Sequence, residues 1–181
     1  MCAAATSSTN FQMSNKHKTP RILAIDPGTR EMGTAVLQGD DLVFHGVKEF
    51  RNRATPHDNL REGRRAVLRL INEYKPSILA LEKSFFANNR NAALLNVLVD
   101  EIQAVGRRKG LKVVTYAPST VKKTVCGNGR ATKRQVAKAV VREYRELRVF
   151  VTQDKKWKEQ YHANMFDAVA VGLTAMRQMP M

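Results

Sequence analysis

Short apolar runs that end in a carboxylate recur along this chain. Residues 22–25 are apolar, Asp26 follows them, and Pro27-Gly28 ends the run. Residues 78–81 have the same pattern and end in Glu82. A short continuous apolar run bounded by turn residues predicts a strand that is buried on both faces. An acid at the end of such a strand is costly unless a cation compensates it, so both strand ends are candidate functional positions.

The first half of the chain predicts three more elements around these two strands. Residues 32–37 and 42–47 are strand candidates on either side of a turn at residues 39–41, and with the first strand they form an antiparallel meander. Apolar residues at helical spacing from Leu60 to Tyr74 predict an amphipathic helix that ends before the strand containing Glu82. The polar residues 88–91 predict a loop.

Residues 92–105 predict a helix that is apolar over a wide arc. A helix of this kind is either deeply buried or shared with a partner. From the pattern alone, burial within one chain is the simpler expectation, and a dimer interface is the alternative.

The second half predicts one more strand and three helices. The strand is expected at residues 111–116, and a short helix at 118–125 precedes the helix breaker at 127–129. Thr132 begins a capping-box sequence that predicts another helix start. Residues 148–160 are polar and predict a loop, and residues 161–178 predict the last helix, which has Asp167 inside its apolar run.

This order of elements predicts an α/β fold with a five-stranded mixed sheet flanked by helices. Residues 21–181 are expected to form a single domain, because neither an internal repeat nor a second domain is evident. Residues 1–20 contain no acid and many small polar residues, which is typical of a disordered tail.

The charge of the chain narrows the classes of partner. Its 181 residues have a net charge of +15, and the sequence pI is near 10.3. Residues 103–158 contain sixteen Lys or Arg and three acids, so most of the excess lies in one segment. A basic surface of this size suits a polyanion, most commonly nucleic acid. A merely solubilising surface is the alternative, but its charges would be more evenly mixed.

Cysteine content and hydropathy point to a reducing compartment without a membrane anchor. The two cysteines, Cys2 and Cys126, form neither a disulfide framework nor a paired metal-binding spacing. No apolar run approaches the roughly 18 residues of a membrane span. We therefore expect a cytoplasmic, DNA-associated protein without a membrane partner.

Three acids suggest a metal site. If the strands ending at Asp26 and Glu82 are parallel neighbours, their carboxylates lie side by side and repel each other unless a proton or cation intervenes. Hard divalent cations, chiefly Mg²⁺, bind such oxygens, and Asp167 on a covering helix would allow two ions about 4 Å apart, as in phosphodiester cleavage. Alternatively, each acid has its own structural role: Asp26 caps a turn, Glu82 pairs with a lysine and Asp167 is exposed.

Four segments in order resemble the motifs of the RuvC family of Holliday junction resolvases. Three of them contain the acids, at residues 22–30, 81–86 and 166–171. The fourth, residues 121–136, is similar to the basic segment most distinctive of that family. Asp26-Pro27-Gly28 alone would be a weak indication, whereas four motifs at fitting intervals over residues 21–178 are specific.

The resemblance implies an RNase H-like fold and an endonuclease that resolves four-way DNA junctions by paired symmetrical nicks in recombination and repair. It implies two Mg²⁺ ions per active site, with Mn²⁺ able to substitute. It also implies a homodimer formed through the helix at 92–105, which reverses the expectation of burial alone. A branch-migration motor is a further partner of the kind that the resemblance suggests.

The resemblance also assigns roles to individual residues. Asp26, Glu82 and Asp167 correspond to metal ligands, and Phe85 to an aromatic residue that contacts bases near the crossover. Lys122 and Lys133 correspond to basic residues that approach phosphates near the cut, and Lys133 could stabilise charge that develops there. The other expected DNA-binding residues are Lys123, Arg130 and Arg134. Alternatively, Phe85 is a phenylalanine of the core, and Lys122 and Lys133 belong to a solvated basic face.

One position departs from the family pattern. The family has a fourth acidic or histidine ligand three residues before the last aspartate, and this chain has Asn164 there. An amide oxygen can bind Mg²⁺ but lacks the carboxylate charge. His162 is turned about 140° away around the helix and is a poor substitute. Whether Asn164 is natural or engineered stays open.

Two alternative functions follow. The first is a junction-binding protein with weak or no cleavage, because Asn164 replaces the acid. The second is an RNase H-like nuclease that acts on other branched DNA or on RNA.

Overall fold

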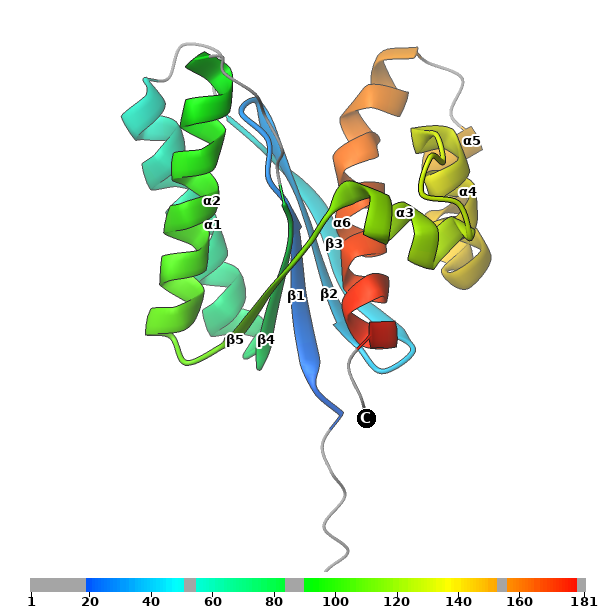
Figure 1. The fold of residues 1–181 in the computed structure, drawn as a ribbon, viewed down its shortest axis with the longest axis horizontal. Helices are drawn as coiled ribbons and strands as arrows, with labels where there is room; N and C mark the ends of the chain where they lie inside the picture. The colour runs from blue at the N-terminus through cyan, green and yellow to red at the C-terminus, as the bar shows by residue number, and fades with distance from the viewer. Residues whose placement is uncertain (1–18, 51–54, 84–89, 153–155, 179–181) are drawn as a thin grey trace, which may run out of the picture.

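The computed structural model describes residues 19–50, 55–83, 90–152 and 156–178. One mixed sheet has the strand order β3-β2-β1-β4-β5 and lies between two groups of helices (Figure 1). Its strands are β1 (Arg21–Asp26), β2 (Glu31–Gln38), β3 (Asp41–Glu49), β4 (Ile78–Glu82) and β5 (Lys112–Tyr116). The helices are α1 (Pro56–Tyr74), α2 (Arg90–Arg108), α3 (Pro118–Cys126), α4 (Lys133–Glu143), α5 (Arg148–Thr152) and α6 (Lys156–Gln178), with a 3₁₀ turn, η1, at Arg145–Leu147.

The alternation of side chains along β1 and β4 divides the core into two parts. Leu23 and Ile25 pack with α1 and α2 on one face of the sheet. Ile22 and Ala24 pack with α3, α4 and α6 on the other face. Because successive side chains of a strand point to opposite faces, Asp26 belongs with Ile22 and Ala24 on the α6 side.

The expected five-stranded mixed sheet flanked by helices is confirmed, including the antiparallel meander of β1, β2 and β3. Two loop predictions are wrong. Residues 148–152 form α5, and α6 begins at Lys156 instead of 161. Of the loop expected at 88–91, residues 90 and 91 instead belong to α2, which begins at Arg90. Residues 88 and 89 lie outside the described residues. The expected tail at 1–20 also lies outside them, apart from Thr19 and Pro20.

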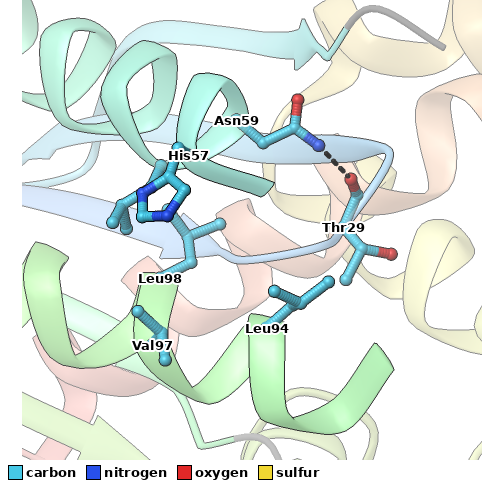
Figure 2. A pocket seen from close by; sticks show the side chains of 7 residues that line it. Thr29, His57, Asn59, Leu94, Val97 and Leu98 are labelled. Carbon is cyan, nitrogen blue, oxygen red and sulfur yellow. Dashed lines mark hydrogen bonds between the residues drawn. The ribbon is translucent and has the colours of Figure 1, made fainter. Parts of the chain in front are cut away.

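The loop that follows Asp26 is held from two sides. The Asn59 side-chain amide on α1 donates a hydrogen bond to the Thr29 carbonyl at 3.4 Å (Figure 2). The backbone N–H of Phe50 donates to the Arg30 carbonyl at 2.8 Å. These two bonds fix the turn between β1 and β2, and the carboxylate at its start is fixed with it.

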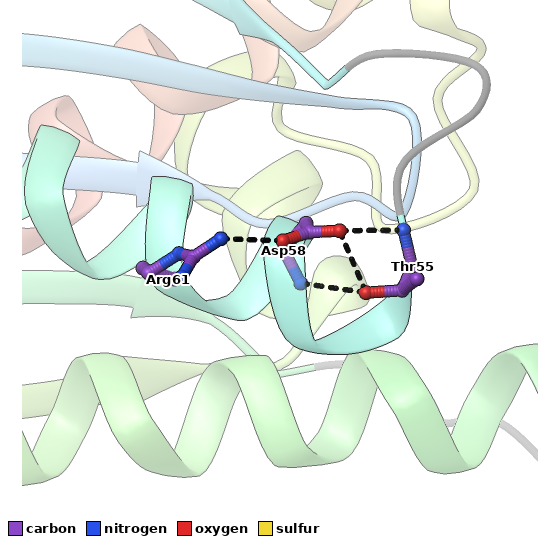
Figure 3. A network of polar contacts seen from close by, with 3 residues as sticks. All are labelled: Thr55, Asp58 and Arg61. Atoms are coloured by element: carbon purple, nitrogen blue, oxygen red, sulfur yellow. Dashed lines mark hydrogen bonds and ion pairs between the residues drawn. The ribbon is translucent and has the colours of Figure 1, made fainter.

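Capping boxes begin helices α1 and α4. At the start of α1 the Thr55 hydroxyl accepts from the Asp58 N–H, and the Asp58 carboxylate accepts from the Thr55 N–H and pairs with Arg61 (Figure 3). Thr132 and Gln135 make the equivalent pair at the start of α4, which confirms the predicted helix start. Such pairs satisfy backbone N–H groups that have no partner within the helix.

Gly33 lets α6 contact the backbone of β2 directly. A Cβ atom at this position would lie 1.8 Å from the Asn164 carbonyl oxygen, where no side chain fits. We expect Gly33→Ala to push α6 away from the sheet and to lower the free energy of unfolding by about 3 kcal/mol. Chemical denaturation would measure this loss.

Gly46→Ala is the matched control for that variant. A Cβ atom at Gly46 on β3 would meet the Phe44 ring at 3.3 Å, which can shift, and the Thr34 hydroxyl at an ordinary contact distance of 3.8 Å. We expect it to cost less than about 1 kcal/mol. Equal losses for the two variants would show that the contact between α6 and β2 at Gly33 is not close.

Candidate active site and nucleic-acid interface

Parallel pairing of β1 and β4 brings two carboxylates to the same edge of the sheet. The register pairs Ile25 with Leu81, so Asp26 and Glu82, which follow them, end neighbouring strands side by side. On β4, Ile78 and Ala80 pack on the α6 side, and the alternation places Glu82 on that side too. The two strands are therefore parallel neighbours, which is the condition under which we expected their carboxylates to lie side by side.

The last helix contributes the third carboxylate, and α4 contributes a cation. Asp167 lies on α6 between the buried Phe166 and Ala168, which pack against the sheet. Lys133, the first residue of α4, places its Nζ 3.3 Å from Asp167 Oδ2 while its side chain stays 68% exposed. An exposed ammonium at the mouth of an acidic site is available to an anionic substrate as well as to Asp167.

The electrostatics of these acids shows that they share one environment. Burial, followed by the charges of Asp167 and Glu82, raises the pKa of Asp26 well above its usual range. Burial and the Asp167 charge raise the pKa of Glu82 to about 7, against the lowering effect of Lys133 and Lys122. Burial also raises the pKa of Asp167, although both lysines oppose this. Three mutually repelling acids that are hard to ionise suit a site that takes up cations.

The oxygen ligands of these carboxylates suit a hard divalent cation, but the side chains are not already arranged around a metal position. Within the ranges that the structure describes, no three His, Cys, Asp or Glu side chains converge closely enough to be a ready metal centre. The donor set is oxygen only, as Mg²⁺ and Mn²⁺ prefer.

Asn164 lies beside the loop between β1 and β2. Its Nδ2 donates a hydrogen bond to the Glu31 carbonyl at 3.4 Å, and the same atom would lie 3.6 Å from a Cβ at Gly28. Because the nitrogen is used in this way, the amide oxygen is the atom left for a ligand. His162 packs against Phe150 in a tilted arrangement, with ring centroids 4.6 Å apart.

Sequence reasoning missed Glu31. The predicted strand began one residue later, at position 32, so this acid was left outside every predicted element. In the structure Glu31 is the first residue of β2, and its charge contributes to the raised pKa of Asp26. Alternation from Gly33, which packs on α6, would have placed it on the same face as Asp26.

The expected DNA-binding cations lie on and between α3 and α4, beside the acids. Lys122 is half-buried and close enough to Glu82 and Asp167 to lower their pKa values. Lys123, Arg130 and Arg134 are exposed. Phe85, the expected base-contacting aromatic, lies outside the described residues. The described helices include none that is long and apolar enough to cross a membrane.

The raised pKa of Glu82 predicts a pH dependence of stability. A carboxyl whose folded pKa is raised stabilises the fold below its unfolded pKa, and this contribution is lost as the pH rises through about 7. In EDTA, Glu82→Gln should therefore gain stability over the parent between pH 5 and pH 8, by roughly 1–3 kcal/mol. Urea denaturation across that range would measure the difference, and a difference independent of pH would contradict the shift.

Comparisons with known proteins point to one family. The family model described as crossover junction endodeoxyribonuclease RuvC matches residues 22–175. A RuvC from Prochlorococcus marinus subsp. pastoris is 32% identical over 162 residues, covering 87% of this chain and 97% of the relative. A RuvC from Neorickettsia sennetsu is 30% identical, over 86% of this chain and 92% of the relative.

Solved structures show the same architecture. The structure of Thermus thermophilus RuvC in complex with a Holliday junction substrate has a TM-score of 0.71 at 21% identity, covering 86% of this chain and 92% of that one. The yeast mitochondrial Holliday junction resolvase has a TM-score of 0.66 at 15% identity, covering 88% and 78%. These likenesses confirm the expected RNase H-like fold.

Proposed function

Because the chain belongs to the RuvC family of crossover junction endodeoxyribonucleases, we propose that it resolves four-way DNA junctions by paired symmetrical nicks. The observation that supports this most is the position of Asp26 and Glu82 at one sheet edge, with Asp167 on α6 and Lys133 on α4 close enough to affect their pKa values. The family uses divalent metal ions. Here we propose two Mg²⁺ ions, replaceable by Mn²⁺.

The three carboxylates and the amide oxygen of Asn164 would hold the ions. When bound, the ions lower the pKa of a water and stabilise the charge on a phosphodiester. Asp26 has acids on both sides and is the residue best placed to serve both ions. Lys133 can leave Asp167 for the scissile phosphate, because its side chain is mostly exposed, and can stabilise charge that develops there.

DNA would lie along the cations of α3, α4 and the turn between them. Lys122, Lys123, Arg130, Lys133 and Arg134 lie on this surface, next to the acids. Phosphate contacts of this kind make affinity fall steeply with salt, with a slope set by the number of phosphates neutralised. The proposed role of Phe85 at the crossover follows from its place three residues after Glu82.

The second active site would come from a second copy of the chain, bound through α2. Leu94 and Val97 on this helix remain 42% and 52% exposed, as an interface helix requires. They line a pocket of about 230 Å³ with Thr29 and Asn59 (Figure 2).

A dimer of this kind would place two sites on one junction, as paired nicks require. The family relationship makes a branch-migration motor a proposed partner. The lack of paired cysteines in the sequence supports the cytoplasm as the proposed location.

Asn164 supports one competing function, a junction-binding protein that cuts weakly. Cleavage of a mobile four-way junction in Mg²⁺ by the parent and by Asn164→Asp separates the two. We expect cleavage by the parent at an enzyme-like rate. A parent that binds junctions tightly but cuts only after Asn164→Asp would favour the binding function.

Competition with other substrates tests the selectivity of the nuclease. A labelled junction is cut in the presence of unlabelled junction, flap, duplex or RNA–DNA hybrid at equal concentration. We expect only the unlabelled junction to compete strongly. Strong competition by flap or hybrid would favour a nuclease for other branched DNA or for RNA.

A further inference from the structure

Glu31 lies next to the active site but belongs to none of the motifs that indicated it. It is the first residue of β2, two positions before Gly33, which pairs directly with Asp26 on β1. Residues two apart on a strand share a face, so Glu31 faces the α6 side together with Asp26. The site therefore has an acid on β2 in addition to those on β1, β4 and α6.

The fold retains this acid at a cost. Glu31 is directly opposite Glu49 across the antiparallel pair of β2 and β3. Like charges in such a position repel and destabilise the sheet. Burial and the Glu49 charge both raise the pKa of Glu31. Because Glu31 destabilises the sheet through this repulsion, we expect its carboxylate to have a function that offsets the loss.

Three observations connect Glu31 with Asn164 and the catalytic acids. The Asn164 amide donates to the Glu31 carbonyl at 3.4 Å, so the two residues are neighbours. Both line a cavity of about 790 Å³, and Lys133 lies on its wall as well. The charge of Glu31 raises the pKa of Asp26, and the charge of Lys133 lowers the pKa of Glu31.

We propose that Glu31 supplies to the divalent-cation site the negative charge that the amide of Asn164 lacks. An asparagine in place of a carboxylate removes one unit of negative charge, and the Glu31 carboxylate on β2 would supply one from the same side of the sheet. This inference rests on the proposed metal-dependent nuclease function. A purely structural role for Glu31, as a partner of Lys133, would leave the affinity for cations unchanged.

The test is a Mn²⁺ titration of the full chain without DNA, with free Mn²⁺ followed by electron paramagnetic resonance. Four proteins form a cycle: the parent, Glu31→Gln, Asn164→Asp and the double variant. We expect Glu31→Gln to weaken Mn²⁺ binding about 10- to 100-fold, as loss of a supporting carboxylate does. The double variant should return to within about threefold of the parent, because Asn164→Asp restores the charge.

Glu49→Gln is the matched control. It removes the same charge from the chain and the same repulsion across β2 and β3, but Glu49 is not among the charges that act on Asp26. We expect it to leave Mn²⁺ affinity within about twofold of the parent. Both glutamine variants should fold and melt slightly higher than the parent, since each relieves like-charge repulsion.

Three results would overturn the proposal: an unchanged affinity in Glu31→Gln, an equal loss in Glu49→Gln, or no recovery in the double variant. Failure of the proposed function is distinguishable from these. A parent that binds no Mn²⁺ and cuts no junction would remove the nuclease function and this inference together. A parent that cuts junctions with Glu31→Gln unaffected in Mn²⁺ binding would remove only the role of Glu31.

Discussion

Replacing Asp26 with asparagine should reduce junction cleavage by at least about a thousandfold, equivalent to about 4 kcal/mol of transition-state stabilisation. Asp26 ends a buried strand, and the charges of Glu82 and Asp167 each raise its pKa. It is therefore the carboxylate that the expected ions would share. An amide in its place keeps the shape of the side chain but removes the negative charge that would balance the two metal ions.

Junction binding should survive this change. The proposed binding surface consists of cations on α3 and α4, so affinity measured in EDTA should stay within about threefold of the parent. Asp41→Asn, an exposed acid at the start of β3, is the control for the loss of one charge and should cleave normally. Cleavage by Asp26→Asn within about tenfold of the parent would remove Asp26 from catalysis.

Lys133→Ala should lower the rate of cleavage by about 100- to 1,000-fold, the usual cost of removing one group that stabilises transition-state charge. Its ammonium contacts Asp167 at 3.3 Å but stays mostly exposed, so the ion pair contributes little to folding. We expect the free energy of unfolding to change by less than about 0.5 kcal/mol. Single-turnover cleavage at saturating protein separates this effect from weaker binding.

Lys109→Ala is the matched control for the loss of a cation. Lys109 is exposed in the turn after α2 and is not among the charges that act on Asp26, Glu82 or Asp167. It should cleave at the parent rate once binding is saturated. A Lys133→Ala variant that also cleaves normally at saturation would assign Lys133 to DNA binding alone.

The placement of Asp26 and Glu82 could be predicted from the sequence because both follow fully apolar strands. Apolar residues on both faces indicate central strands with parallel pairing, and parallel neighbours end at the same edge. The alternation then sets the face that each acid occupies. That reasoning needs only local patterns, and the register of β1 with β4 agrees with it.

The secondary-structure prediction was wrong where tertiary contacts stabilise a helix in a polar segment. Residues 148–160 were expected to be a loop because they are polar, yet 148–152 and 156–160 are helical. Arginine, lysine, glutamate and glutamine are good helix formers, and a helix that is already anchored by a buried stripe extends at low cost. Leu147 is buried and Phe150 packs against the core, which supports the short helix α5.

Glu31 was missed for a different reason. A single acid beside a turn has no periodicity of its own, and its nearness to Asp26 depends on the pairing of β2 with β1. The contact of Lys133 with Asp167 likewise depends on how α4 packs on α6. The resemblance suggested the role of this lysine, whereas spacing along the chain could not.

The central claim is that two copies of this chain, each with a metal-dependent acidic site, cut one junction symmetrically. The direct measurement is a mobile four-way junction labelled in turn on each of its four strands and incubated with the parent protein in Mg²⁺ or in EDTA. We expect nicks at matching positions in two opposite strands, in Mg²⁺ only. Cleavage in EDTA, unpaired nicks, or an intact junction in Mg²⁺ would contradict it.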